Sequence, residues 1–178
     1  MDKDIQSILF TEKELSQKTA ELAQMVNEEY KDKDFIMVTV LKGGFMFAAD
    51  LMRKMNIHVN INFIAVSSYG ASAKSSGAVK IIKDLDSDVN GKHVLIVEDI
   101  VDTGLTLSYL KQLILSRGAK SVKICTIMNK PARRKVDIDI EYVGFEVPDE
   151  FVVGYGLDYC EKYRNLPYVG ILKKEVYT

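Results

Sequence analysis

The chain has 178 residues, with 24 lysine and arginine residues against 25 aspartate and glutamate residues. The resulting net charge of −1 gives no field for nonspecific binding of nucleic acid, and no apolar stretch is long enough to cross a bilayer. A composition of 47% hydrophobic and 28% charged residues is typical of a globular protein with a real core, and the length predicts one compact domain.

Two local features predict a cytoplasmic protein. Residues 1–4 are acidic, whereas the start of a signal peptide is basic. The two cysteines, Cys125 and Cys160, lie far apart in the chain and do not have the spacing of metal ligands, which indicates incidental reduced thiols. We therefore expect a cytoplasmic protein that binds neither a membrane nor nucleic acid.

Hydrophobic periodicity predicts alternating helices and strands in the first half of the chain. In chain order these are a helix from about 11 to 30, a strand over 35–41, a helix through about 55 and a strand over 57–63. Thr11 and Glu14 have the spacing of a capping box at the first helix, and Gly43-Gly44 forms the turn into the second. Residues 67–77 are rich in serine, alanine and glycine and predict a mobile loop.

The second half continues the alternation and sets the fold class. We expect strands over 79–82, 93–98, 121–128, 141–145 and 151–154, a helix from about 103 to 117, and an irregular tail after Tyr155. Strands that alternate with helices favour an α/β fold with a mainly parallel twisted sheet flanked by helices.

The strongest functional signal lies where the strand over 93–98 ends. A continuous apolar run at 94–97 is followed by Glu98 and Asp99, and the segment 102–106 (Asp102-Thr103-Gly104-Leu105-Thr106) then opens a helix. Ligands of parallel sheets bind beyond the carboxyl ends of the strands, and the start of a helix can hold a phosphate. Acids beside a phosphate site suggest a phosphorylated sugar with Mg²⁺, although Asp99 or Asp102 alone could equally be a helix cap.

Two other segments are ambiguous when taken singly. Lys42-Gly43-Gly44 is either a tight strand-to-helix turn or a diphosphate-binding turn. The segment 141–159 contains a strand, a Pro-Asp turn, a second short strand and an acid-bearing loop. Its Phe151 could stack on a flat heterocycle or simply belong to the core.

Together, in this order and spacing, these segments resemble the hypoxanthine-guanine phosphoribosyltransferases, a type I phosphoribosyltransferase family of purine salvage. The stretch Val-Gly-Tyr-Gly-Leu-Asp-Tyr at 153–159 separates the chain from adenine and orotate relatives. The resemblance implies transfer of the 5-phosphoribosyl group of phosphoribosyl diphosphate (PRPP) to N9 of a 6-oxopurine, with release of diphosphate. It also implies Mg²⁺, a homodimer or homotetramer, and a single domain with a small hood built from the N-terminal segment and about 150–178.

The resemblance assigns the first set of roles to the acid pair and the loop after it. Glu98 and Asp99 would engage the ribose hydroxyls, directly or through water and Mg²⁺, and Asp102 would be the general base beside purine N7. Residues Asp102, Thr103, Gly104, Leu105 and Thr106 would bind the 5-phosphate. Leu105 is a departure, because some relatives have lysine there, and backbone N–H groups and hydroxyls would then hold the phosphate.

The remaining roles fall on the base and the diphosphate. For the purine, Lys130 would read the exocyclic O6, Phe151 would stack on the ring, and Val152 would offer backbone contacts. The other implied residues are Lys42 and Gly43 in a diphosphate turn that can carry a non-proline cis peptide, Arg164 on the diphosphate, Asp158 on a second Mg²⁺, and Ser68 and Tyr69 at the tip of a lid.

Two alternatives remain open at this point. One is transfer to another base, such as xanthine alone or a pyrimidine. The other is a regulatory protein of the same fold that retains a PRPP site but binds RNA. The near-neutral charge favours the enzyme over the RNA-binding protein.

Overall fold

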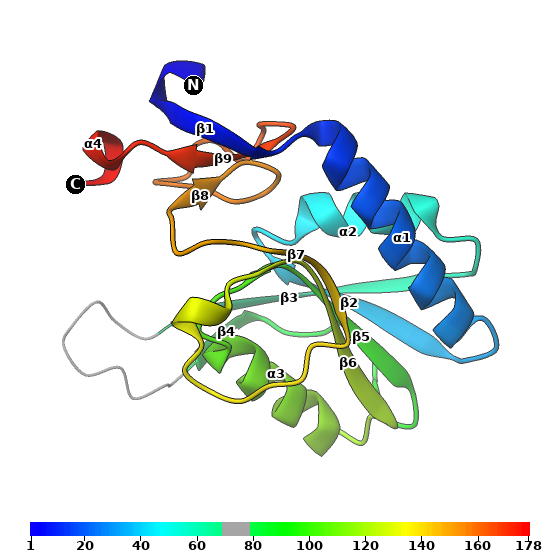
Figure 1. Cartoon of the computed structure of the whole chain (residues 1–178). Coiled ribbons are helices and arrows are strands. Elements are labelled where there is room, and N and C mark those ends of the chain that lie inside the picture. Colours follow the sequence, from blue (N-terminus) through cyan, green and yellow to red (C-terminus); the bar gives the residue numbers. More distant parts are fainter. Residues whose placement is uncertain (69–78) are drawn as a thin grey trace.

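The computed structural model describes residues 1–68 and 79–178 and contains two sheets (Figure 1). The larger sheet has the strand order β4-β3-β2-β5-β6-β7, and neighbouring strands are parallel except for β3 and β4. Its strands are β2 (Phe35–Leu41), β3 (Asn60–Ser68), β4 (Val79–Lys83), β5 (His93–Val101), β6 (Ser121–Asn129) and β7 (Tyr142–Glu146). The prediction of an α/β fold with a mainly parallel sheet is confirmed.

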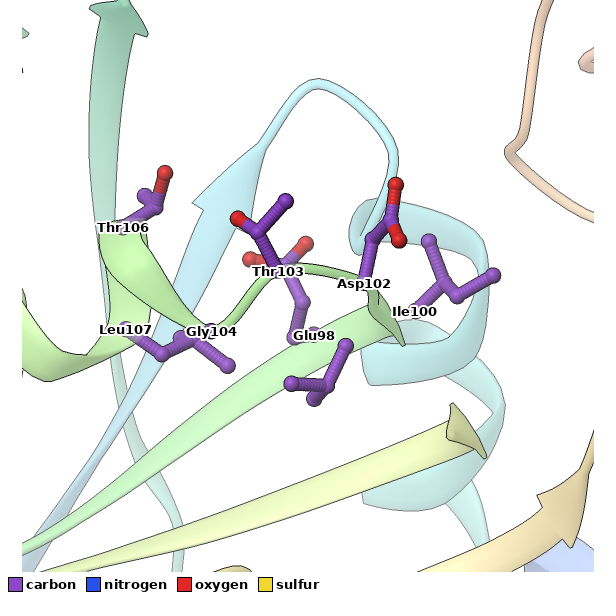
Figure 2. A pocket seen from close by; sticks show the side chains of 8 residues that line it. Glu98, Ile100, Asp102, Thr103, Gly104, Thr106 and Leu107 are labelled. Atoms are coloured by element: carbon purple, nitrogen blue, oxygen red, sulfur yellow. The ribbon is translucent and has the colours of Figure 1, made fainter. Parts of the chain in front are cut away.

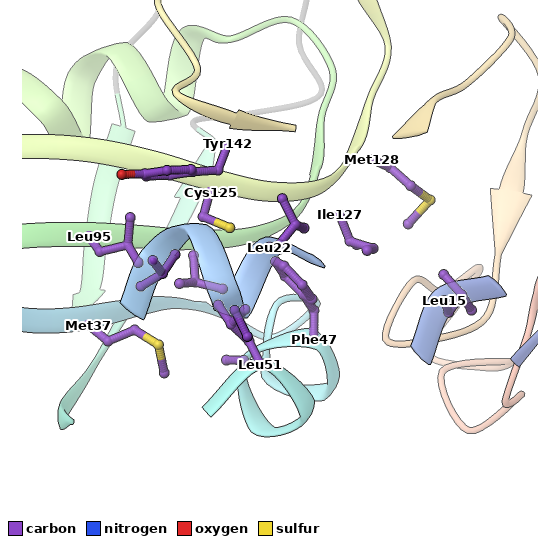
Figure 3. Packing of buried hydrophobic residues seen from close by; sticks show 14 of the residues in the cluster. Leu15, Leu22, Met37, Phe47, Leu51, Leu95, Cys125, Ile127, Met128 and Tyr142 are labelled. Carbon is purple, nitrogen blue, oxygen red and sulfur yellow. The ribbon is translucent and has the colours of Figure 1, made fainter. Parts of the chain in front are cut away.

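Helices cover both faces of the larger sheet, which explains why its central strands β2 and β5 contain long apolar runs. Helices α1 (Glu12–Tyr30) and α2 (Phe45–Lys54) lie on one face, and α3 (Leu105–Ser116) lies on the other (Figure 1). On the first face, Leu22 and Phe47 of the helices pack against Leu95, Cys125 and neighbouring strand residues (Figure 3). No helix in the described residues is long and apolar enough to span a membrane.

The predicted start of α1 is confirmed in detail. The Thr11 backbone N–H donates to the Glu14 carboxylate over 2.8 Å, and the Glu14 N–H donates to the Thr11 hydroxyl over 3.3 Å. This reciprocal capping box satisfies backbone donors that the first helical turn leaves without partners. It therefore fixes where the helix begins, and with it the position of the apolar face that covers the sheet.

The second sheet joins the two ends of the chain. Its antiparallel strands are β1 (Ile5–Phe10), β9 (Val169–Leu172) and β8 (Val152–Val153), and it is flanked by the short helices η1 (Asp2–Asp4) and α4 (Lys174–Tyr177). We call it the small sheet. Strand β1 was not predicted, and the expectation of an irregular tail after Tyr155 was wrong for β9 and α4. These elements are too short to show a clear period, and β1 pairs with two register irregularities.

Several predicted boundaries also shift. Strand β3 begins at Asn60 instead of 57 and continues to Ser68, because its last residues pair with β4. Strand β5 continues to Val101, and α3 begins at Leu105, two residues after the predicted start. Of the two predicted lid residues, Ser68 ends β3 and pairs with Val79, whereas Tyr69 lies outside the described residues.

Candidate active site

Glu98 and Asp99, the acid pair, lie within β5, just beyond the last β5 residue that pairs with β2. Strand β2 pairs with β5 only up to Thr39 and Val97, whereas β6 pairs with it as far as Val101. Glu98 and Asp99 lie just beyond the end of the β2 pairing, and they are only 8% and 6% exposed. The prediction that they follow the end of the strand was therefore wrong by a few residues, because β6 extends the ladder past them.

Burial controls the protonation of these two carboxyl groups. Loss of solvation raises the pKa of Glu98 well above its ordinary value, and the adjacent Asp99 charge raises it further. Burial also raises the pKa of Asp99, against the opposing effect of hydrogen bonds such as that donated by the Ile100 N–H over 2.8 Å. The site therefore resists holding two negative charges unless a cation is close to it.

The Gly43 turn packs directly on this pair. A Cβ atom at Gly43 would lie 1.8 Å from Asp99 Oδ2, and one at Gly156 would lie 2.2 Å from the Gly43 carbonyl oxygen. The turn thus lies between the Asp99 carboxylate and the Gly156 backbone, with no room for a side chain. The structure has a non-proline cis bond at Leu41-Lys42, one bond before the Lys42-Gly43 position that the resemblance suggested.

A cavity of about 200 Å³ lies along the loop after β5. Its lining residues are Glu98, Ile100, Val101, Asp102, Thr103, Gly104, Thr106 and Leu107. Figure 2 shows the Asp102 carboxylate and the Thr103 and Thr106 side chains on the same side of the loop. The structure therefore brings the predicted phosphate residues together around one hollow, with the exception of Leu105.

The loop is held by the segment that follows β6. Gly104 caps α3 with a φ of 79°, in the left-handed region that favours glycine, and a Cβ there would lie 3.0 Å from Arg134 Cδ. The Lys135 N–H donates to the Thr103 carbonyl over 2.9 Å, and Arg134 Nε donates to the Asp102 carbonyl over 3.2 Å. These contacts fix the backbone of the loop and leave its side chains directed to the cavity.

Asp102 offers an acceptor oxygen without a protein partner. Its Oδ1 is buried and has no hydrogen-bond partner among the described residues, while its Oδ2 lies 3.9 Å from Nη1 of Arg133. Arg133 in turn is paired with Asp149 over 2.6 Å. Buried polar atoms are nearly always paired, so the unpaired oxygen of Asp102, a residue that lines the cavity, is a candidate acceptor for a ligand proton.

Lys130 is a buried lysine that directly follows β6, and two hydrogen bonds position it. It is 5% exposed, and its N–H donates to the Val101 carbonyl over 2.9 Å. Its Nζ donates to the Glu150 carbonyl over 2.7 Å, which leaves further N–H donors on the ammonium group. Burial lowers the pKa of Lys130, and the charge of nearby Arg133 lowers it further.

Phe151 follows Glu150 in the chain, and the Glu150 carbonyl accepts the hydrogen bond from Lys130. The Phe151 ring stacks on Tyr177 with a centroid distance of 4.9 Å, and it makes a T-shaped contact with Tyr159 with a centroid distance of 5.5 Å. Val152 begins β8 and pairs with Ile171. The structure thus brings the predicted purine residues Lys130, Phe151 and Val152 together, although they lie beside the cavity and are not part of its lining.

The predicted diphosphate and second-metal residues form a separate charged group. Nη2 of Arg164 lies 2.8 Å from Asp158 Oδ1, and Nη1 donates to the Gly156 carbonyl over 2.8 Å. Lys42 Nζ lies 3.1 Å from the Glu161 carboxylate, which also lies 3.5 Å from Arg164. Opposite charges are therefore paired here, and Gly156 connects this group to the Gly43 turn.

Comparison with known proteins identifies the family. Residues 6–160 match the family model described as phosphoribosyl transferase domain. The chain belongs to this family. The phosphoribosyl transferase is 54% identical to the hypoxanthine-guanine phosphoribosyltransferase of Bacillus subtilis over 177 residues, which is 99% of this chain and 98% of the relative. It is 53% identical over its full length to the bifunctional protein TilS/HprT of Listeria monocytogenes, of which it spans 28%.

The fold of the phosphoribosyl transferase has a close counterpart among solved structures. A crystal structure of a hypoxanthine phosphoribosyltransferase from Staphylococcus aureus matches with a TM-score of 0.97 and 48% identity. The match covers 100% of this chain and 97% of that one. The family resemblance and the fold predicted from the sequence motifs are confirmed.

Sequence reasoning missed several residues that contribute to this site. Ile100 and Val101 line the cavity, and their only signal was their place between the acid pair and Asp102. Arg133 lies near Asp102, and Glu161 pairs with Lys42. Exposed charged residues in loops carry no local signal of such contacts, because the partners are distant in sequence.

The acid pair fits a Mg²⁺ site that substrate completes. Among the described residues, no three or more His, Cys, Asp or Glu side chains are grouped to hold a metal ion. Mg²⁺ usually takes one or two carboxylates and fills its remaining positions with water and substrate phosphates. Glu98 and Asp99 supply two adjacent carboxylates whose raised pKa values a nearby cation would lower.

Replacement of Glu98 by glutamine is expected to stabilise the free protein at neutral and higher pH. The folded-state pKa of Glu98 lies above its ordinary value of 4.5, so the stability that the protonated group provides is complete below that value and is lost as the pH rises. Each pKa unit is worth about 1.4 kcal/mol, and about 1 kcal/mol corresponds to about 2–4 °C for a chain of this size.

The measurement is the unfolding midpoint of both proteins in EDTA from pH 4.5 to 8.5. We expect a higher midpoint for Glu98→Gln, by a difference that grows with pH. The exposed Glu28→Gln is the control and should show no such slope. A midpoint difference that is flat or falls with pH would contradict the burial penalty.

Proposed function

We propose that this phosphoribosyl transferase transfers the 5-phosphoribosyl group of PRPP to N9 of hypoxanthine or guanine and releases diphosphate. The observation that carries the proposal is the unpaired Oδ1 of Asp102 beside the buried acid pair, in a cavity with Thr103 and Thr106. The comparisons support the same reaction, because full-length relatives bear the name hypoxanthine-guanine phosphoribosyltransferase.

The ribose 5-phosphate group occupies the cavity in this proposal. The Thr103 and Thr106 hydroxyls and the N–H groups at the start of α3 bind the phosphate, aided by the positive end of the helix dipole. Glu98 and Asp99 accept hydrogen bonds from the ribose hydroxyls. Displacement at C1′ builds positive charge on the sugar, as in glycoside chemistry, and the nearby carboxylates stabilise that charge.

The base lies between Asp102 and Lys130. Asp102 Oδ1 accepts the N7 proton, and the N–H donors that Lys130 does not give to Glu150 bind the 6-oxo group. An ammonium group cannot accept a hydrogen bond, so it disfavours a 6-amino group. Phe151 stacks on the ring, and the Val152 backbone contacts its edge.

The diphosphate lies over the Gly43 turn. Lys42 and Arg164 are the cations that bind it, and each then exchanges a carboxylate partner for a phosphate oxygen. Mg²⁺, held by Glu98 and Asp99 and at a second position by Asp158, would neutralise charge on the departing diphosphate. The small sheet and its loops, which carry Phe151, Asp158 and Arg164, are the hood. The homodimer or homotetramer stays a prediction.

The test is incubation with PRPP, Mg²⁺ and one of hypoxanthine, guanine, xanthine or adenine. We expect IMP and GMP to form only with Mg²⁺ present, and little or no product from adenine. Absence of nucleotide from every oxopurine would contradict the proposal, and preferential use of xanthine, or of uracil in a further incubation, would favour transfer to another base. A salt-sensitive mobility shift with RNA would favour the regulatory alternative.

A further inference from the structure

Phe151 is held by aromatic contacts that the proposed reaction does not explain. Tyr177, the penultimate residue, stacks on the Phe151 ring at 4.9 Å with an interplanar angle of 26°. Tyr159 makes a T-shaped contact with the same ring, at 5.5 Å and 87°. Two aromatic rings of the protein therefore contact Phe151.

Backbone hydrogen bonds tie the segment before Tyr177 to Phe151 and to the start of the chain. The Leu172 N–H donates to the carbonyl of Phe151 itself over 2.8 Å, and the Lys173 N–H donates to Asp4 over 3.0 Å. The chain then enters α4, and both Val176 and Tyr177 pack against the apolar cluster of the small sheet: Val153, Tyr163, Leu166 and Leu172. Tyr177 is thus held together with Phe151 in the apolar cluster of the small sheet.

Phe151 is linked to the cavity through Lys130. The Lys130 backbone N–H donates to the carbonyl of Val101, which lines the cavity. Glu150, the residue before Phe151, is bonded through its carbonyl to Lys130. In the proposed function, the purine stacks on the Phe151 face that Tyr177 does not cover.

We propose that Tyr177 is a positioning residue for the purine, because its stacked ring holds Phe151 in the orientation that stacks on the base. The inference rests on the proposed function, in which Phe151 binds the purine. Strand β8 is only 2 residues long, so the backbone alone gives Phe151 little support. A ring held in place before the base arrives avoids the entropic cost of ordering it on binding.

The Tyr177 ring, and not its hydroxyl group, is the part that acts in this proposal. Other tyrosines of the same cluster use their hydroxyls, because Tyr163 donates to Asp4 over 3.0 Å and Tyr168 donates to Asp2 over 2.9 Å. Tyr177 contributes a stacked face, which phenylalanine reproduces and leucine does not. This difference separates positioning from a general contribution to the small sheet.

The experiment measures KM for hypoxanthine and for PRPP separately in the full-length enzyme. Loss of an aromatic pair predicts a rise of about 3- to 10-fold in KM for hypoxanthine in Tyr177→Leu and Tyr177→Ala, with KM for PRPP and the unfolding midpoint little changed. Tyr177→Phe should match the parent. Tyr168→Ala, which removes another ring of the cluster that does not stack on Phe151, should leave KM for hypoxanthine unchanged.

Phe151→Ala separates this inference from the proposed function. We expect it to raise KM for hypoxanthine, and Tyr177→Leu should add little in that background, because the two residues act through one ring.

An unchanged or lower KM for hypoxanthine in Tyr177→Leu would overturn the inference. An equal rise in KM for PRPP would also overturn it, as would failure of Tyr177→Phe to match the parent. If Phe151→Ala itself leaves KM for hypoxanthine unchanged, the base-stacking role fails. If the parent forms no nucleotide, the proposed function fails.

Discussion

Replacement of Asp102 by asparagine is expected to lower the rate of nucleotide formation by about 10²- to 10⁴-fold, the usual contribution of a positioned proton acceptor. Oδ1 of Asp102 is buried in the cavity wall without a partner among the described residues. Asparagine keeps the shape of the side chain but cannot take up a proton. Binding of PRPP should persist, because Thr103 and Thr106 are unchanged and the Arg134 contact is to the backbone of residue 102.

Two measurements separate these effects. Single-turnover rates with saturating hypoxanthine report the chemical step, and calorimetric titration with Mg²⁺ and PRPP reports binding. Asp149→Asn is the matched control, since it removes the other carboxylate that pairs with Arg133, at 2.6 Å, and leaves the cavity intact. Turnover close to that of the parent in Asp102→Asn would show that Asp102 is not the proton acceptor.

The central part of the fold could be predicted because its signals are local. Strands β2 and β5 are buried on both faces and contain long apolar runs, and a capping box marks the start of α1. The acid pair and the loop at 102–106 form a short motif within one strand-to-helix connection. Their proximity therefore follows from the sequence alone.

The rest of the site depends on contacts between distant segments, which no local pattern encodes. Gly156 packs on Gly43, Lys130 bonds to Glu150, and Tyr177 stacks on Phe151. The small sheet joins the first and last strands of the chain, each of them short. The extension of β5 past the acid pair likewise follows from its pairing with β6, a tertiary property.

Replacement of Gly43 by alanine is expected to lower kcat/KM for PRPP by about 10²-fold. A displacement of a substrate-binding group by about 1 Å can cause a loss of this size. The added Cβ would lie 1.8 Å from Oδ2 and 2.6 Å from Cγ of Asp99, so the carboxylate must move. Asp99 is buried and its Oδ1 is held by the Ile100 N–H, so moving it breaks an interaction and misplaces a proposed ribose ligand.

The assay varies PRPP at saturating hypoxanthine and is paired with unfolding midpoints in EDTA. Gly91→Ala is the control for a glycine-to-alanine change, since nothing lies within 4 Å of its Cβ and its φ of +71° costs only local strain. It should reduce stability without lowering kcat/KM. In an Asp99→Ala background the Gly43→Ala change should cost little stability, because the atoms it strikes are gone. Parent-like kinetics in Gly43→Ala would show that the Asp99 carboxylate can leave the turn without loss, and hence that it is not a ligand of the substrate.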